Sequence, residues 1–325
     1  MNIESWPISK LSNLSTPFNS TFGDPPKLLE DSIQKIGVIH PPLLLTEKTG
    51  QPILISGKRR IEIAKKINPH QTLWVKSYTR EELTNLQAFH LNLYENLSIR
   101  KFNAIEKSNV LALLTNLGIS QESLQKEYLS LLELPLKEET PQQYFYLQKL
   151  DEETKQLVSL GILQVDSALI LLKLDFKDRS CLTSLIQNLR LGVNPQKILI
   201  RLAWDIFKKG NIPPHELFES QTMKNILEEE SWSTGQKWAS IEYELRKLRY
   251  PRLSQMEEEF KNIKKEMKLP PTITLQSPPY FESPDYALQL RFRNLEDYQE
   301  KLAILQQMGN NKNMEKLFKL TTEYE

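Results

Sequence analysis

The fold is decided by one short stretch of this 325-residue chain, Ile53-Leu54-Ile55-Ser56-Gly57-Lys58-Arg59-Arg60. Its first four residues are typical of a buried β-strand, and residues 60–67 have the apolar spacing of a helix that ends at Asn68-Pro69. The glycine between them can adopt the backbone conformations that a tight turn requires. The sequence therefore predicts a strand that leads directly into the N-terminus of a helix.

This predicted corner has the chemistry of an anion-binding site. The first backbone N–H groups of a helix have no partner within the helix, and the helix dipole favours negative charge there. Lys58, Arg59 and Arg60 add positive charge, and the two arginines add forked donors that match phosphate oxygens. Because Gly57 lets a ligand approach the backbone, we expect a polyphosphate site. The alternative is a helix start whose basic residues face only solvent.

The residues around the corner alternate between strand and helix patterns. Helices are expected over residues 25–36 and 80–92, and further strands over residues 42–45 and 73–75. A turn is expected at Lys48-Thr49-Gly50-Gln51. Such alternation with short connections is typical of a compact α/β unit, which we place at residues 1–100.

The rest of the chain follows a different pattern. Residues 101–235 contain short segments with apolar residues three and four apart, which predicts an all-helical middle domain. Residues 236–325 predict a small module with two charged helices that are separated at Pro251, two strands around a Pro-rich turn, and a last helix. The predicted fold class is therefore α+β. The apolar face of the hairpin is either an ordinary core or a dimer interface; it contains Leu288, Leu290 and Phe292.

Bulk charge does not make this chain a nucleic-acid-binding protein. Its formal net charge is +1 and 39% of its residues are hydrophobic, so we expect packed cores and exclude binding by net charge alone. The first 100 residues carry 12 basic and 9 acidic side chains, against 30 and 32 in the remainder. Any nucleotide or nucleic-acid site must therefore come from local pattern, such as the predicted corner.

Several classes of site and location are excluded by residue type. The single cysteine, Cys181, rules out a disulfide framework and a zinc site built on paired thiolates. The histidines lie too far apart in the sequence for a structural metal site. The first residues lack the pattern of a signal peptide, and no apolar run is long enough to span a bilayer. We expect a cytoplasmic protein with no membrane partner.

A second polar feature, Glu95-Asn96, closes the predicted α/β unit. A carboxylate beside a carboxamide can ligate Mg²⁺ through oxygen, and a divalent ion commonly accompanies a bound triphosphate. The alternative is an ordinary polar pair at the end of a helix.

Three segments, in this order, resemble the boxes of the ParB family of partition proteins. Residues Asp31–Pro42 resemble the first box, and Ser56–Ala64 resembles the second, whose usual form is Gly-Glu-Arg-Arg-x-Arg-Ala. Glu95-Asn96-Leu97 followed by Phe102–Lys107 is similar to the third. The resemblance covers residues 20–117 and continues as a helix pattern to residue 208. It implies a ParB/sulfiredoxin-like N-terminal domain followed by a helix-turn-helix-type domain.

The resemblance implies that the N-terminal domain binds CTP together with Mg²⁺. Glu95 and Asn96 would bind the metal. Glu95 would also be the candidate catalytic residue, and the protein would be at most a slow CTP hydrolase. The residues that would contact the nucleotide are Gly57, Lys58, Arg59, Arg60, His40, Pro41, Asn96 and Arg100.

The chain departs from the family pattern at several of these positions. Lys58 replaces the usual glutamate, and Glu62 replaces the last arginine of the second box. Ser98-Ile99 replaces the usual Gln-Arg, with Arg100 one place late. Lys58 and Arg100 restore positive charge, whereas Glu62 would oppose a phosphate. Sulfiredoxin, which has the same fold, needs a cysteine where this chain has Lys58, so a thiol-based reductase is excluded.

Residues 118–150 occupy the place of a helix-turn-helix. The second helix of the pair would begin at Pro141, and its candidate DNA-contacting residues are Gln142, Gln143, Gln148 and Lys149. Glutamines can read adenine edges, but this helix has no arginine for a phosphate and its connector is long. The alternative is a purely structural helical hairpin.

The sequence and the resemblance together predict a ParB-like DNA-binding protein of chromosome or plasmid partition, with CTP- and Mg²⁺-dependent switching of DNA clamping. The expected partners are DNA, a second copy of the chain and a ParA-type ATPase. Two alternatives stay open. One is a nuclease or nucleotide-dependent kinase on the same fold, and the other is a non-catalytic adaptor that has lost nucleotide binding.

Overall fold

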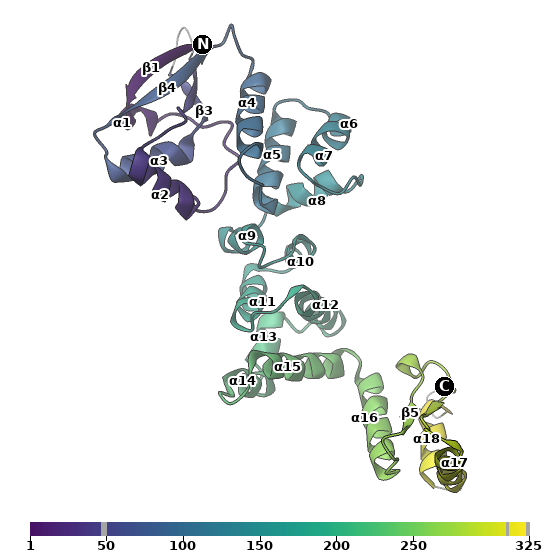
Figure 1. Cartoon of the computed structure of the whole chain (residues 1–325). Helices are drawn as coiled ribbons and strands as arrows, with labels where there is room; N and C mark the ends of the chain where they lie inside the picture. The colour runs from purple at the N-terminus through teal and green to yellow at the C-terminus, as the bar shows by residue number, and fades with distance from the viewer. Residues whose placement is uncertain (47–50, 310–311, 323–325) are drawn as a thin grey trace. The chain divides into compact units, whose positions relative to one another are not determined.

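The predicted strand-to-helix corner is present in the computed structural model of the chain (Figure 1). Strand β3 (Ile53–Ser56) ends at Gly57, and helix α3 (Lys58–Ile67) begins at the next residue. Gly57 has φ 105°, in the left-handed region that favours glycine. A Cβ atom at this position would lie 2.9 Å from the Cβ of Pro42. Backbone conformation and close packing therefore both require glycine here.

The corner belongs to a four-stranded sheet with the order β1-β4-β2-β3. The other strands are β1 (Asn2–Pro7), β2 (Leu43–Thr46) and β4 (Thr72–Thr79). β2 and β4 are parallel, whereas the β1–β4 and β2–β3 pairs are antiparallel. The sequence analysis did not predict β1, which pairs with β4 about seventy residues later in the chain.

Each face of the sheet contributes to a different core, because successive side chains of a strand point to opposite faces. Leu44 and Leu54 pack in one core with residues of α1 (Ile8–Leu11) and α3, and α2 (Lys27–Ile36) packs beside α3.

Leu45 and Ile55 pack in the second core against Phe89 and Leu93 of α4 (Asn85–Leu97), which lies beside β3 in Figure 1. The second core continues into α5 (Ala104–Asn116) and the helical turns that follow it.

Helix α4 differs from its predicted range of 80–92. It begins after Thr84, whose side chain accepts a hydrogen bond from the Gln87 amide while the Gln87 side chain accepts one from the Thr84 amide. This capping box fixes the start of the helix, and the helix runs on through Leu97. Glu95 and Asn96 therefore lie in the last turn of α4 rather than beyond it.

The structure describes residues 1–46, 51–309 and 312–322, so most of the predicted turn at Lys48-Thr49-Gly50-Gln51 lies outside the described residues. The chain divides into two compact units, Met1–Lys197 and Ile198–Glu325. The finer division at residues 100 and 235 stays a prediction. Unit 1 continues after α5 with helices and one π-helical segment: α6 (Gln121–Ser123), η1 (Leu124–Tyr128), α7 (Leu129–Leu131), α8 (Thr140–Leu147), α9 (Glu152–Ser159), α10 (Val165–Leu171), α11 (Phe176–Asn188) and the start of α12 (Val193–Gly210).

Unit 2 contains the rest of α12 and the predicted C-terminal module. The expected break at Pro251 is confirmed, since Pro251 is the first residue of α16. The remaining elements are α13 (Pro214–Glu219), α14 (Gln221–Glu228), α15 (Thr234–Arg249), α16 (Pro251–Glu266), β5 (Ile273–Gln276), η2 (Pro279–Phe281), β6 (Ala287–Leu290), α17 (Leu295–Gly309) and α18 (Lys312–Thr322). The α+β fold class is confirmed.

The predicted hairpin is formed by β5 and β6, which are antiparallel. A small core beside it contains Ile263, Leu275 and Leu317. On the other strand, Leu288 is 44% exposed, and Phe292 just beyond it is 56% exposed. The apolar hairpin face is therefore largely open within the chain, and its use as a dimer interface stays a prediction.

Candidate functional site

A cleft of about 510 Å³ lies beside the β3–α3 corner. Its walls come from residues 16–32, the corner itself, the last turns of α4 and the residues after α4. Pro41 is not among its lining residues, but its neighbour His40 is. The sequence-predicted residues that line the cleft are His40, Gly57, Lys58, Arg59, Arg60, Glu95, Asn96 and Arg100.

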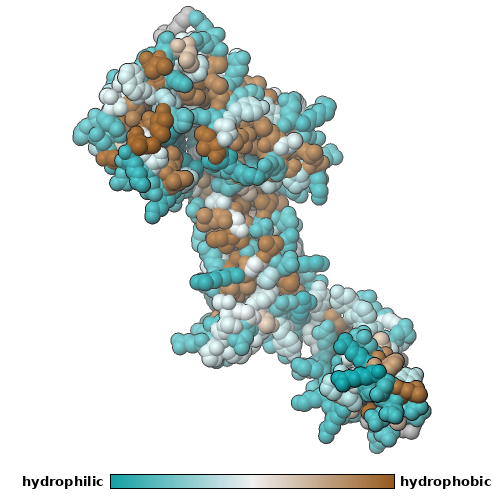
Figure 2. Space-filling view, in the orientation of Figure 1, coloured by the Kyte–Doolittle hydropathy of each residue, from teal (hydrophilic) through white to brown (hydrophobic). Residues whose placement is uncertain are grey.

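Apolar residues also line the cleft. Pro26, Leu28 and Leu29 line it from the start of α2, and Leu54 and Ile99 line it from other elements. Leu28 is 80% exposed, and Figure 2 shows apolar surface over the part of unit 1 that contains α2 and α3. A cleft with convergent cations and an apolar wall suits a ligand that has both a charged and a flat apolar part.

Arg60 connects three elements at the polar wall. Its Nη2 lies 2.7 Å from Glu95 Oε1 on α4 and 3.3 Å from Ser56 Oγ at the end of β3. Its Nη1 donates to the His40 carbonyl at 2.6 Å. The Arg60 and Glu95 side chains are only 15% and 25% exposed, so this ion pair is poorly screened by solvent.

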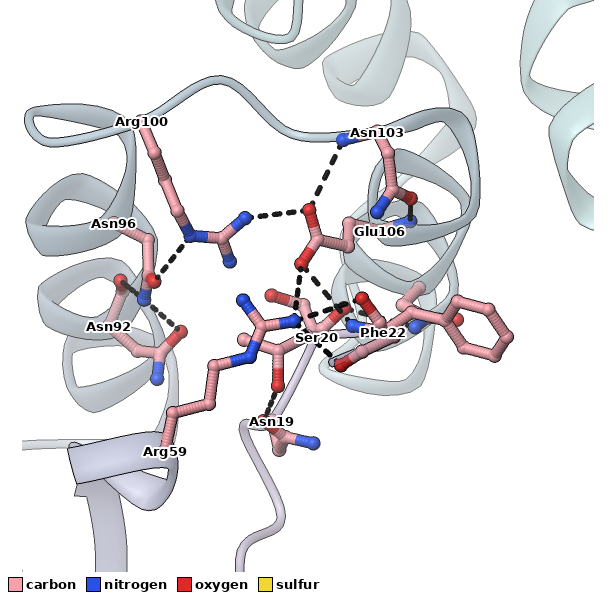
Figure 3. A network of polar contacts seen from close by, with 12 residues as sticks. Asn19, Ser20, Phe22, Arg59, Asn92, Asn96, Arg100, Asn103 and Glu106 are labelled. Carbon is pink, nitrogen blue, oxygen red and sulfur yellow. Dashed lines mark hydrogen bonds and ion pairs between the residues drawn. The ribbon is translucent and has the colours of Figure 1, made fainter. Parts of the chain in front are cut away.

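Arg59 points to the other side of the cleft, toward the strap, the segment of residues 19–24 that precedes α2 (Figure 3). Its Nη2 donates to the carbonyls of Phe22 and Gly23 at 2.9 and 3.0 Å, and lies 3.7 Å from Glu106 Oε1. Burial lowers the pKa of the Arg59 guanidinium below its ordinary value, and the positive charge of Arg100 lowers it further. Two guanidinium groups therefore lie near one another here, with the Glu106 carboxylate beside both.

Asn92 fixes the end of α4 against the corner, and Asn96 contacts Asn92 and Arg100. Asn92 Nδ2 donates to the Ile55 carbonyl at 2.5 Å, and Asn96 Nδ2 donates to the Asn92 carbonyl at 2.9 Å. Asn96 Oδ1 accepts a long bond of 3.4 Å from Arg100 Nε. Of the predicted pair, Asn96 is thus held by Asn92 and Arg100, and Glu95 is held by Arg60.

Two buried polar atoms of the cleft have no hydrogen-bond partner: Glu95 Oε2 and Arg100 Nη2. A buried polar atom without a partner is costly, so each of these atoms favours a ligand of opposite charge. Arg100 Nη2 suits an anion, and Glu95 Oε2 suits a cation.

The residues present fit a Mg²⁺ ion that arrives with phosphate. Glu95 offers one carboxylate oxygen and Asn96 one amide oxygen, and Mg²⁺ in such sites takes one or two protein ligands with phosphates and water. Within the described parts of the chain, no group of three or more His, Cys, Asp or Glu residues could hold a metal by itself.

Two of the residues that depart from the family pattern lie in the first two turns of α3. Lys58 lines the cleft, and its side chain is 42% exposed. Glu62 is not a lining residue; its carboxylate lies 4.0 Å from Lys58 Nζ on the solvent side of the helix. Glu62 therefore does not face an anion in the cleft directly, although its charge still acts on Arg59.

The candidate DNA-contacting residues on and after α8 are not equivalent. Gln142, Gln148 and Lys149 are exposed, and Gln143 is half-buried. Gln148 Nε2, however, donates to Ser108 Oγ and Asn109 Oδ1 of α5 at 2.7 and 2.8 Å. Gln148 therefore fixes α8 to α5, which leaves Gln142, Gln143 and Lys149 as the available groups.

Sequence reasoning did not single out Glu106 as a residue of this site. Its side chain is 1% exposed and contacts both Arg59 and Arg100. The available signal was the spacing Asn103-x-x-Glu106, a capping box that the structure confirms at the start of α5. This spacing predicts the helix start but not the contacts with arginines.

Comparisons with known proteins give weak matches only. No family model matches the chain, and no curated protein matches it. Among solved structures, it is similar to a C-terminally truncated chromosome-partitioning protein ParB from Caulobacter crescentus complexed with CTP-gamma-S, with 18% identity over 53% of this chain and 93% of that chain and a TM-score of 0.25. It is also similar to a structure of the C-terminally truncated protein complexed to the centromeric parS site. The identity is 20% over 61% of this chain and 98% of that chain, and the TM-score is 0.33. Matches at this level assign no function to the chain.

One further finding concerns membranes. In residues 1–46, 51–309 and 312–322, none of the helices combines the length and apolar character that a bilayer span requires.

Proposed function

We propose that this chain is a ParB-like DNA-binding protein of chromosome or plasmid partition whose N-terminal cleft binds CTP with Mg²⁺. One observation carries the proposal. The three segments that resemble the ParB boxes are far apart in the sequence, yet residues from all three line one cleft: His40, the corner from Gly57 to Arg60, and Glu95 with Asn96.

The triphosphate would lie at the corner. The free amides at the start of α3 and the Lys58, Arg59 and Arg60 side chains supply donors and positive charge on one side, and Arg100 Nη2 supplies a donor that has no partner in the protein. The apolar wall formed by Pro26, Leu29 and Leu54 would cover the base.

Glu95 and Asn96 would hold the Mg²⁺ ion, which when bound neutralises phosphate charge. Glu95 Oε1 would keep Arg60 in place at the same time, because one carboxylate has an oxygen for each partner. Any hydrolysis of CTP would be slow, with Glu95 as the candidate residue that orients a water molecule.

The nucleotide would act as a switch rather than as a substrate for turnover. α4, which bears Glu95, shares its apolar core with α5 and η1 of the helical region, so a change at the cleft reaches that region through packed side chains. Two subunits would close on DNA, with Gln142, Gln143 and Lys149 at the DNA surface. A ParA-type ATPase would be the partner in partition, in the cytoplasm.

A titration of the full chain tests this proposal. Calorimetry with CTP, ATP and GTP, each with and without Mg²⁺ and DNA fragments, is expected to show binding that prefers CTP, requires Mg²⁺ and is altered by DNA. Failure of every nucleotide to bind at millimolar concentration would contradict the proposal and favour the adaptor alternative.

A further inference from the structure

One buried carboxylate, Glu106 in the first turn of α5, bridges the two arginines on the far side of the cleft (Figure 3). Glu106 Oε2 lies 2.7 Å from Arg100 Nη1, and Oε1 lies 3.7 Å from Arg59 Nη2. The Arg59 and Arg100 side chains are partly open to the cleft, at 14% and 23% exposure, whereas Glu106 is 1% exposed. The carboxylate therefore lies behind the arginines, on their protein side.

The same carboxylate holds two backbone segments. Its Oε1 accepts from the Phe22 amide at 3.2 Å, and its Oε2 accepts from the Asn103 amide at 3.1 Å. Phe22 belongs to the strap, which is also bound to Arg59 through the Phe22 and Gly23 carbonyls and to α5 through a bond of 3.0 Å from Asn109 Nδ2 to the Ser20 carbonyl. Glu106 thus joins the strap, the corner and the start of α5.

We infer that Glu106 is a positioning residue that acts as the internal counter-anion of the cleft and couples anion binding there to the strap and to α5. This inference rests on the proposed function, because it concerns the same cleft. A phosphate that contacts Arg59 and Arg100 Nη2 draws the two guanidinium groups toward the cleft and away from Glu106. A buried carboxylate cannot lose its cations without cost, so Glu106 moves with them and its bond to the Phe22 amide lengthens.

Glu106→Gln is the decisive variant. Glutamine can accept from the Asn103 amide as the third residue of a capping box, so the start of α5 is retained while the charge is removed. The matched control is Glu62→Gln, which removes the same charge from α3 at an exposed position outside the cleft lining. The probe is inorganic tripolyphosphate, which has no base, used beside CTP.

We expect Glu106→Gln to bind tripolyphosphate about fivefold or more tightly than the wild type, as is typical of a coupled site. Glu62→Gln should stay within about twofold of the wild type, since an exposed charge is screened. Hydrogen exchange followed by mass spectrometry should show faster exchange of the strap in wild-type protein when tripolyphosphate is added. In Glu106→Gln the strap should exchange rapidly with or without it.

The outcomes separate this inference from the proposed function. If the wild type binds CTP but Glu106→Gln binds tripolyphosphate no more tightly, or Glu62→Gln tightens equally, the inference is wrong and the proposed function stands. If only Glu106→Gln binds, the inference stands and the proposed function is wrong. Binding by neither protein contradicts both. Should Glu106→Gln not fold, the wild-type exchange decides: a strap that tripolyphosphate leaves unchanged or protects contradicts the inference.

Discussion

Arg60 and Glu95 form an ion pair between α3 and α4, with Arg60 Nη2 2.7 Å from Glu95 Oε1. This pair brings together the two motifs that the sequence suggested for phosphate and for metal, which lie 35 residues apart in the chain. The contact leaves Glu95 Oε2 buried and without a partner. We therefore expect Glu95 to affect the binding of metal and Arg60 to affect the binding of phosphate.

Replacement of Glu95 by glutamine should remove the Mg²⁺ dependence of CTP binding. Glutamine keeps an oxygen for Arg60 but lacks the negative charge that a divalent cation requires, so CTP affinities measured by calorimetry with and without Mg²⁺ should converge. Glu152→Gln, at an exposed position in α9, is the control and should behave as the wild type. If Mg²⁺ raised the CTP affinity of Glu95→Gln as much as that of the wild type, the Glu95 carboxylate would not bind the metal.

Replacement of Gly57 by alanine should destabilise the chain more than the same change at Gly118, which follows α5. Both glycines have positive φ, which costs alanine roughly 1–2 kcal/mol. At Gly57 the new Cβ would also meet Pro42 at 2.9 Å, whereas nothing lies within 4 Å at Gly118, and such overpacking costs about 1–3 kcal/mol more. Urea unfolding measures the free energy of each variant. Equal decreases in the free energy of unfolding would show that Pro42 moves away at little cost and that its close approach to Gly57 has little effect on stability.

Asp151 should give unit 1 a pH-dependent stability. Burial alone would raise the pKa of the Asp151 carboxyl, but hydrogen bonds from the Thr154 amide and hydroxyl and the charge of Arg179 hold the pKa below its ordinary value. The stabilisation is therefore present above the pKa of the unfolded chain, about 3.9, and is lost as the pH falls through the lower folded pKa. Asp151→Asn keeps a capping oxygen but loses the ion pair with Arg179 and the negative charge at the N-terminus of α9, so it should cost up to about 1 kcal/mol at pH 7.

The check is chemical unfolding of the wild type and Asp151→Asn as a function of pH. The difference between their free energies of unfolding should shrink below about pH 4. Glu153→Gln, an exposed residue of the same helix, is the control. A difference that stays constant down to pH 2 would mean that the carboxylate charge has no role.

Lys149 and Gln148, which follow α8, should have different roles: Lys149 should bind DNA, and Gln148 should stabilise the fold. Lys149→Ala should weaken DNA binding and lower the slope of log affinity against log salt by about one, as expected for a phosphate contact. Gln148→Ala should instead cost about 1 kcal/mol of stability, because Ser108 Oγ and Asn109 Oδ1 each lose the hydrogen bond that Gln148 donates. Fluorescence anisotropy and thermal unfolding measure the two effects. An unchanged salt slope in Lys149→Ala would favour the structural hairpin.

The corner at Gly57 could be predicted because its signals are local: an apolar strand, a glycine and a helix start lie within eight residues. The start of α4 was predicted too early because the charged residues from Arg80 to Glu82 fit a helical pattern, whereas the Thr84–Gln87 capping box decides it. Strand β1 and the role of Glu106 could not be predicted. β1 forms by pairing with the distant β4, and Glu106 contacts the Phe22 amide 84 residues away.

The most direct test of the account is the CTP affinity of Arg59→Ala plus Arg60→Ala, measured by calorimetry in the presence of Mg²⁺. The matched control is Lys65→Ala plus Lys66→Ala, which removes the same charge from the last turn of α3. The double arginine variant should bind at least about tenfold more weakly than the wild type, a change of ~1.4 kcal/mol, and the lysine variant should not. Equal affinity of the wild type and the arginine variant would contradict the proposed nucleotide site.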